Sequence, residues 1–156
     1  MEKPNFPLAV VMQRRPAQSR WADVVWEPHG VVPGYLGGER KLLVQHDGVA
    51  QWLHPGFKLE LFHDESEGYY LNLYSPQPYV FVNWLEEEGK GVPQSVTVSY
   101  NEAARQMDGG ARVDGVPMPV EWISWLAEYV QKHYKPEAKK KRSRPPSFKG
   151  AKRDAA

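Results

Sequence analysis

The stretch that decides the fold is FKLELFHDESEGYYLNLYSPQPYVFVNWL, residues 57–85. Within it, residues 57–63 and 69–75 alternate apolar and polar side chains, and residues 79–85 are apolar on both faces. Alternation with a period of two is typical of strands that bury one face, and apolar residues on both faces are typical of the middle of a sheet. We therefore predict three consecutive strands, with HDESEG as an exposed hairpin loop and a fourth strand in SVTVSY (95–100).

Two extended segments are predicted near the amino terminus. The first spans residues 6–15, and Pro16 should close it or lie at a sheet edge, because proline cannot donate to a hydrogen-bond ladder. The second spans residues 21–32, where Pro28 and Gly30 indicate a bulge or an edge position.

A hairpin is predicted between these segments and the deciding stretch. Apolar runs at residues 41–45 and 49–53 flank His46–Asp47–Gly48. An Asp-Gly pair between two apolar runs is a strong short-range hairpin signal, because both residues tolerate positive φ.

Two helices are predicted after the strands. Ser99 and Glu102 have the spacing of a capping box, and Gly109 is placed to end the helix that they begin. Pro119 fits the first position of a second helix, and Pro136 should stop it. The apolar residues of this second helix recur at three- and four-residue spacing: Ile123, Leu126, Ala127, Val130 and Tyr134.

The order of these elements, strands first and helices last, predicts an α+β fold. We expect a mainly antiparallel β-sheet or small barrel of about seven to eight strands, followed by a short helix and a C-terminal amphipathic helix. A chain of 156 residues can bury a core as one domain. We expect a single globular domain over residues 1–134 and a basic, disordered tail over residues 135–156.

The composition excludes several kinds of site. The chain has no cysteine, which rules out thiolate catalysis, disulfides and zinc sites of the cysteine type. The apolar run at residues 7–12 is too short for a signal sequence or a membrane span. We expect a cytoplasmic protein with no membrane span.

The net charge of +1 conceals an acidic body and a basic tail. Residues 135–156 hold nine basic and two acidic residues, a net charge of 9 − 2 = +7, and residues 1–134 carry 11 − 17 = −6. Such a tail can bind phosphates of a nucleic acid, dock on an acidic partner or increase solubility. Nucleic acid is the disfavoured reading, because Phe148 is the only ring interleaved with the tail's charges. The electrostatic cluster of the tail is Lys139, Lys140, Lys141, Arg142 and Arg144.

No catalytic, cofactor-binding or metal-binding residue is predicted. His54 and His63 lie near Asp64 and Glu65, but nothing spaces them as ligands on one element, and hydrogen-bonded loop histidines are the better reading. The glycine-containing segment LGGERK (36–41) could be compared with the loops that bind nucleotide phosphates. It is followed by a predicted strand and not by a helix, so we interpret it as a connecting loop.

Arg14, Arg15 and Trp21 bracket one predicted turn between the first two extended segments. Arginine and tryptophan dominate the binding energy of many protein interfaces, so these three residues are candidates for a partner-binding site. The alternative, a solvated arginine pair and a core tryptophan, stays open.

Several blocks resemble an uncharacterised proteobacterial family. They are PLAVVMQRRP, W-x4-W-x-P, LELFHDESEGYYLNLYSPQP and DGGARVDGVPMPVEWISWL, in this order. Together they are similar to a domain-of-unknown-function family in the three-thousand-three-hundreds series. Genes of that family often neighbour those of molybdenum-dependent formate dehydrogenases, and its members are sometimes labelled molybdopterin-guanine dinucleotide biosynthesis protein A. The resemblance implies an accessory or maturation role around a molybdoenzyme and carries no catalytic residues.

We therefore expect a non-enzymatic accessory protein that binds a protein partner, such as a formate dehydrogenase subunit or its maturation machinery. An enzyme or cofactor-binding protein of the molybdopterin pathway and a nucleic-acid-binding module are the alternatives. A nucleotidyltransferase is disfavoured, because the first predicted strand runs into Arg14–Arg15–Pro16 where a glycine-rich loop should follow.

Overall fold

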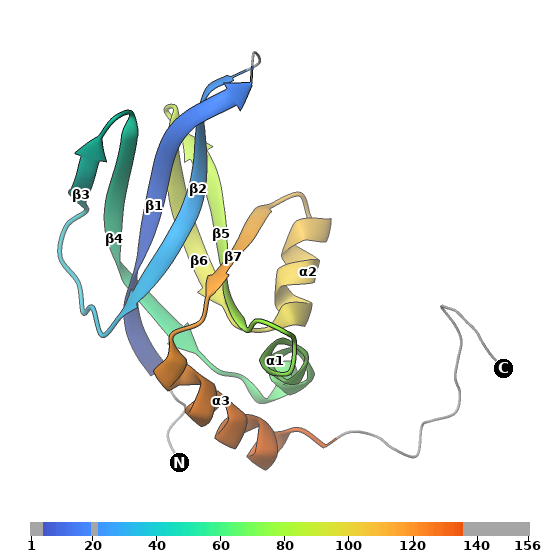
Figure 1. Cartoon of the computed structure of the whole chain (residues 1–156). Helices are drawn as coiled ribbons and strands as arrows, with labels where there is room; N and C mark the ends of the chain where they lie inside the picture. Colours follow the sequence, from blue (N-terminus) through green and yellow to red (C-terminus); the bar gives the residue numbers. More distant parts are fainter. Residues whose placement is uncertain (1–4, 20–21, 136–156) are drawn as a thin grey trace, which may run out of the picture.

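The computed structural model describes residues 5–19 and 22–135. Two antiparallel sheets pack face to face, with helices at one end and along one side (Figure 1). The four-stranded sheet has the order β2-β1-β4-β3, and the three-stranded sheet has the order β6-β5-β7. The strands of the two sheets are β1 (Asn5–Ser19), β2 (Ala22–Pro33), β3 (Lys41–His46), β4 (Val49–Glu60), β5 (Tyr79–Glu87), β6 (Lys90–Thr97) and β7 (Arg112–Pro117).

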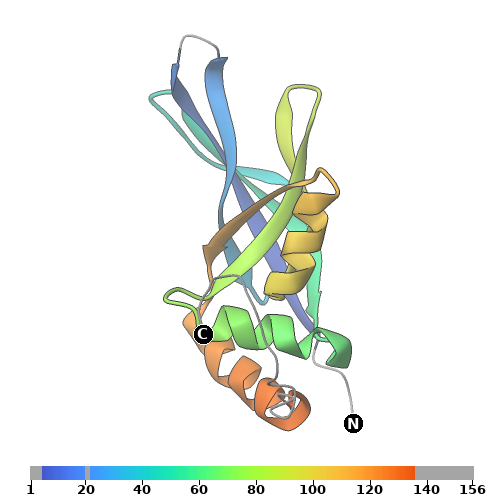
Figure 2. The same ribbon diagram turned by 90° about the vertical axis from the view of Figure 1, so that its right-hand side faces the viewer.

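Three α-helices and one 3-10 turn complete the described part of the chain. They are η1 (His63–Glu65), α1 (Ser66–Leu73), α2 (Tyr100–Asp108) and α3 (Val120–His133). Figure 2 shows α1 between α2 and α3, and both neighbours contact it. The β3–β4 and β5–β6 turns lie at the opposite end of the molecule (Figure 1). The prediction of an α+β fold with antiparallel sheets is confirmed, and within the described residues the two sheets do not form a closed barrel.

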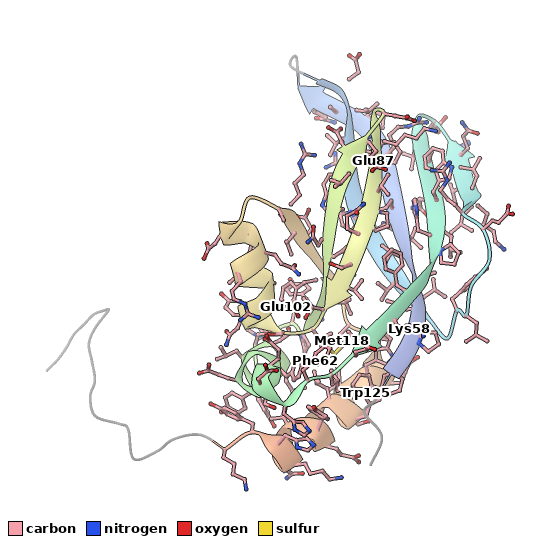
Figure 3. The ribbon with its side chains drawn as sticks, turned by 180° about the vertical axis from the view of Figure 1, so that it is seen from behind. Lys58, Phe62, Glu87, Glu102, Met118 and Trp125 are labelled. Atoms are coloured by element: carbon pink, nitrogen blue, oxygen red, sulfur yellow. The ribbon has the colours of Figure 1, made fainter. Side chains whose placement is uncertain are left out.

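The core lies between the inner faces of the two sheets. From β1 it takes Leu8, Val10 and Met12, which alternate along the strand, and from β5 it takes Val80 and Val82. Helix α3 covers the end of this core with Trp122, Leu126, Tyr129 and Val130. The start of β1 is held there by Phe6, whose ring stacks on that of Trp125 at 4.1 Å. Figure 3 shows the two ends of the sandwich, with Trp125 at the helix end and Glu87 at the hairpin end.

The predicted strand at residues 69–75 is wrong, because residues 69–73 belong to helix α1 and residues 74–75 lie in the turn that follows it. The predicted hairpin loop HDESEG is wrong as well: it forms η1 and the first turn of α1. The buried residues of α1 include Tyr69, Asn72 and Leu73, which are spaced by three and four. An apolar segment of seven residues satisfies the strand and helix patterns equally, so its alternation could not decide between them.

Strand β7 was not predicted, and two of the helices interrupt the expected order of strands. Helix α1 lies between β4 and β5, and α2 lies between β6 and β7. The expectation that all helices follow all strands is therefore wrong, although both sheets remain antiparallel.

The predictions of a turn at Asp47–Gly48 and of a bulge in β2 are confirmed. Asp47 and Gly48 have φ of 53° and 81° in the β3–β4 hairpin, as a type I′ turn requires. In β2, Gly30 pairs with Val11 and Pro28 pairs with Met12, which leaves His29 as the extra residue of a bulge. Strand β1 continues past Pro16 to Ser19, where it pairs with β2 and no longer with β4.

The predicted helices are present with small changes at their ends. Ser99 caps α2 by accepting a hydrogen bond from the Glu102 amide at 3.0 Å, and Gly109 follows the last residue of α2. The Ser99 amide donates to Thr97 Oγ1 at 3.0 Å, and Thr97 Oγ1 donates to the Glu102 carboxylate at 2.6 Å, so the capping box is closed through Thr97. Pro119 is the residue before α3 and not its first residue. Pro136 lies outside the described residues, and so do the predictions for the rest of the tail.

Candidate interaction surface

Arg14 and Arg15 lie on opposite faces of β1. On the outer face of the four-stranded sheet, Arg15 donates two hydrogen bonds to the Glu27 carboxylate, at 2.7 and 3.3 Å. Gln13 donates to the same carboxylate at 3.1 Å and accepts from Gln51 at 2.7 Å. The hydrogen bond from Arg15 lowers the pKa of Glu27, and the same contact raises the pKa of Arg15. This polar row joins three neighbouring strands across their exposed face.

Arg14 lies over the tryptophans at the edge of the core. Its guanidinium is 5.5 Å from the centre of the Trp52 ring, and Trp52 stacks on Trp26 at 5.5 Å. A Cβ atom at Gly91 of β6 would lie 2.9 Å from the Cβ of Trp26, so the facing sheet approaches this tryptophan closely. Arg14 and Arg15 therefore do not share one surface, although both are on one strand.

The remaining predicted site residues are outside the described part of the chain. They are Trp21 and the tail cluster Lys139, Lys140, Lys141, Arg142 and Arg144. The partner-binding role of Arg14, Arg15 and Trp21 at the β1–β2 hairpin stays a prediction.

The histidines do not converge on a metal site. His54 is half-buried opposite Val10, and its burial, with Arg40 nearby, lowers its pKa to about 4. His63 instead stacks on His133 of α3, with ring centres 4.1 Å apart, and partial burial lowers the pKa of His133. Within residues 5–19 and 22–135, no group of three or more histidine or carboxylate side chains could hold a metal ion.

A polar network joins the start of α1 to the start of α2. The Glu65 carboxylate accepts from Ser99 Oγ at 2.6 Å and from the guanidinium of Arg105. Ser99 is fully buried, and its hydroxyl oxygen also accepts the amide of Glu102. Both bonding directions of this hydroxyl are used, so Ser99 holds the two helices together and is not placed to act as a nucleophile.

Helix α1 presents an apolar face to solvent beside the end of α3. Tyr70, Leu71 and Tyr74 are exposed, Tyr74 by 66%. The Tyr70 ring is 5.0 Å from that of Tyr74 and 4.9 Å from that of Tyr134, which follows α3. We call Tyr70, Leu71, Tyr74 and Tyr134 the α1 surface. Sequence reasoning missed it because Tyr70 and Tyr74 are neighbours only on a helix, where residues four apart meet.

The backbone behind the α1 surface is held firmly. The Asn72 amide donates to the carbonyls of Tyr79 and Val98 at 2.8 and 2.9 Å and accepts from the Tyr79 amide at 2.9 Å. The Tyr69 hydroxyl accepts from the Phe62 amide at 2.9 Å. One face of α1 is therefore bonded to both neighbouring segments while the other carries the exposed rings.

Comparison with known families gives a match that covers most of the chain. The model of a family described as a protein of unknown function (DUF3305) matches residues 7–143. The chain belongs to the DUF3305 family. No curated protein and no solved structure matches it.

The DUF3305 match begins at Pro7, within β1, and includes every later described element up to α3. The α1 surface, the polar row at Arg15 and the Glu65–Ser99 network therefore all lie within the family's region. In the described part of this DUF3305 chain, no helix has the length and apolar character needed to span a membrane.

Proposed function

We propose that this DUF3305 protein is a non-enzymatic accessory protein that binds a protein partner through the α1 surface. The observation that carries the proposal is the exposure of Tyr70 and Leu71 on a short helix and of Tyr74 at its C-cap, while the other face of the helix is buried and hydrogen-bonded. Aromatic residues are enriched at protein interfaces, because they offer a large apolar area and a polar tip at a small cost in side-chain entropy.

The rigidity of α1 supports this assignment. Binding costs free energy for every side chain or loop that becomes ordered, and a surface that is already fixed avoids part of that cost. The three hydrogen bonds of Asn72 fix α1 relative to the start of β5 and to Val98, which follows β6, before any partner arrives. The exposed rings are thus presented on an ordered element.

The partner that we propose is a subunit of a molybdenum-dependent formate dehydrogenase or a component of its maturation machinery. The resemblance of the sequence blocks to the family supports this choice. The acidic body, with a charge of 11 − 17 = −6 over residues 1–134, favours a partner whose contact surface is basic.

The test is a binding titration of the full chain against the purified formate dehydrogenase of the same organism. The wild type should bind, and the Tyr70→Ser/Tyr74→Ser variant should bind at least about 30-fold more weakly, as expected for interface residues worth about 2 kcal/mol. Tyr100→Ser is the matched control, because Tyr100 is an exposed tyrosine that packs instead on Phe81. If the double variant binds as tightly as the wild type, the α1 surface is not the binding site. If the wild type does not bind, this formate dehydrogenase is not the partner.

The hairpin hypothesis is tested in the same titration. An Arg14→Ala/Arg15→Ala variant should keep its fold, since the contact of Arg14 with Trp52 and the partly exposed ion pair of Arg15 with Glu27 should each contribute about 1 kcal/mol or less. If this variant loses binding of the partner while Tyr70→Ser/Tyr74→Ser keeps it, the binding surface is the β1–β2 hairpin and not the α1 surface.

A further inference from the structure

Strand β3 is an outer strand with an apolar, solvent-exposed side. It is the last strand of the order β2-β1-β4-β3 and pairs only with β4 among the described residues. All six of its residues are exposed. Leu42, Leu43 and Val44, at its centre, are between 42 and 47% exposed. Three consecutive aliphatic residues on an open sheet edge are a template for pairing with another strand.

The other outer strands are protected in two ways. Proline occurs at Pro28 and Pro33 of β2, Pro93 of β6 and Pro117 of β7, and proline removes a donor from the edge. In addition, β2 contacts β7 and β4 contacts β6, so the two sheets protect each other along their sides. Strand β3, KLLVQH, has neither proline nor glycine, and Figure 1 shows it at the outer edge, far from the helices.

We propose that β3 is a self-association edge, at which two copies of the chain pair β3 with β3 antiparallel about a two-fold axis. The two four-stranded sheets then form one eight-stranded sheet. A two-fold contact of this kind is closed, because each copy offers the same strand to the other, and it leaves no free β3 edge.

The charges at the two ends of β3 favour this antiparallel arrangement. Arg40 and Lys41 lie at its start and Asp47 follows its end. An antiparallel pair centred on Val44 brings Lys41 of each copy beside Asp47 of the other, and it places Val44 of one copy opposite Val44 of the other at the axis. A parallel pair would instead set like charges beside each other, which is destabilising.

The strength of the contact is limited by a bulge. The register between β3 and β4 shifts between Leu42 and Val44, so Leu43 is the extra residue. A bulge bends its strand and restricts how far a neighbouring ladder can extend. A contact of one short strand falls in the size class below about 1,200 Å², in which complexes are weak and transient. We therefore expect an equilibrium between monomer and dimer that depends on concentration.

The first experiment measures the mass of the full chain by sedimentation equilibrium between about 1 μM and 1 mM, the range of a weak interface. The wild type should shift from monomer to dimer, and Leu43→Lys should weaken the association by about tenfold or more, because a lysine on an edge opposes strand pairing. Leu36→Lys is the matched control, since Leu36 is 85% exposed in the loop before β3 and the charge change is identical.

The second experiment uses the absence of cysteine from the chain. In a Val44→Cys variant the two new thiols meet at the proposed axis, so mild oxidation should give a disulfide-linked dimer, and Leu36→Cys should not. The Tyr70→Ser/Tyr74→Ser variant should dimerise as the wild type does, which separates this edge from the α1 surface. A wild type that stays monomeric at about 1 mM overturns the proposal. The proposal is also overturned if the wild type dimerises but Leu43→Lys and Leu36→Lys weaken the association equally.

Discussion

Two neighbouring stretches, YYLNLYS (69–75) and YVFVNWL (79–85), have similar compositions but different secondary structures. Each begins with an aromatic residue and contains one asparagine among apolar side chains. The first forms helix α1 and the second forms β5, the central strand of the three-stranded sheet. Local pattern did not distinguish them, so the difference must come from contacts with the rest of the chain.

The two asparagines show what those contacts are. Asn72 is buried and its amide serves three backbone groups, two of them at Tyr79, the first residue of β5. Asn83 is half-buried on the other strand face from Val82 and Trp84. From Phe81 to Trp84 the backbone of β5 is paired with both β6 and β7, whereas Tyr79 at its start is paired with β7 only and is also bonded by the Asn72 side chain. Helix α1 therefore completes the hydrogen bonding of the strand that follows it.

The largest expected effect comes from removing this side chain. Asn72→Leu keeps the volume and leaves the amide of Tyr79 and the carbonyls of Tyr79 and Val98 without these partners, so the free energy of unfolding should fall by about 3 kcal/mol or more. The matched control is Asn83→Leu, which should change it by within about 0.5 kcal/mol. Denaturant unfolding measures both. Equal losses would show that Asn72 does not decide the structure of its stretch.

A smaller loss is expected from a glycine of α1. A Cβ atom at Gly68 would lie 2.1 Å from Ser99 Oγ and 3.0 Å from the amide nitrogen of Asn101. Gly68→Ala should thus lower the free energy of unfolding by about 2 kcal/mol, even though alanine favours helix by about 1 kcal/mol. Gly109→Ala is the control, because its Cβ would make only an ordinary contact at 3.5 Å. A stabilised Gly68→Ala variant would mean that α1 is free to move away from α2.

The smallest effect should come from one hydroxyl. Tyr69→Phe removes the acceptor of the Phe62 amide and should cost about 1 kcal/mol, the usual value of a single hydrogen bond. Tyr70→Phe, on the exposed side of the same helix, should cost nothing measurable. Thermal unfolding of the pair compares the two faces of α1 directly. If the two variants unfold together, the contact to Phe62 contributes nothing to the helix.

The elements that were predicted correctly are those whose signals are local. Asp47 and Gly48 specify their own turn, and Ser99 with Glu102 specifies the start of α2, since each set lies within four residues. Strand β7 gave no such signal. Gly115 weakens its strand pattern, yet a Cβ there would lie 2.9 Å from the Tyr79 ring on the neighbouring strand. The packing that requires this glycine cannot be read from residues 112–117 alone.

The candidate site was predictable only in part. The strand predicted at residues 6–15 already implies that Arg14 and Arg15 point to opposite faces, because side chains alternate along a strand. The α1 surface was not predictable in this way. In a strand, Tyr70 and Tyr74 would be four residues apart along an extended backbone, and their rings would not be neighbours. The decision depends on Asn72 and its bonds to Tyr79 and Val98, the latter 26 residues away along the chain.

Each sheet is built from its own length of chain, the first ending at Glu60 and the second beginning at Tyr79. During synthesis, all four strands of the first sheet leave the ribosome before the second sheet exists. Their inner face, with Leu8, Val10 and Met12, stays uncovered until β5, β6 and α3 follow. At the usual speed of translation this delay is on the order of seconds, so the nascent chain exposes an apolar sheet that chaperones can recognise.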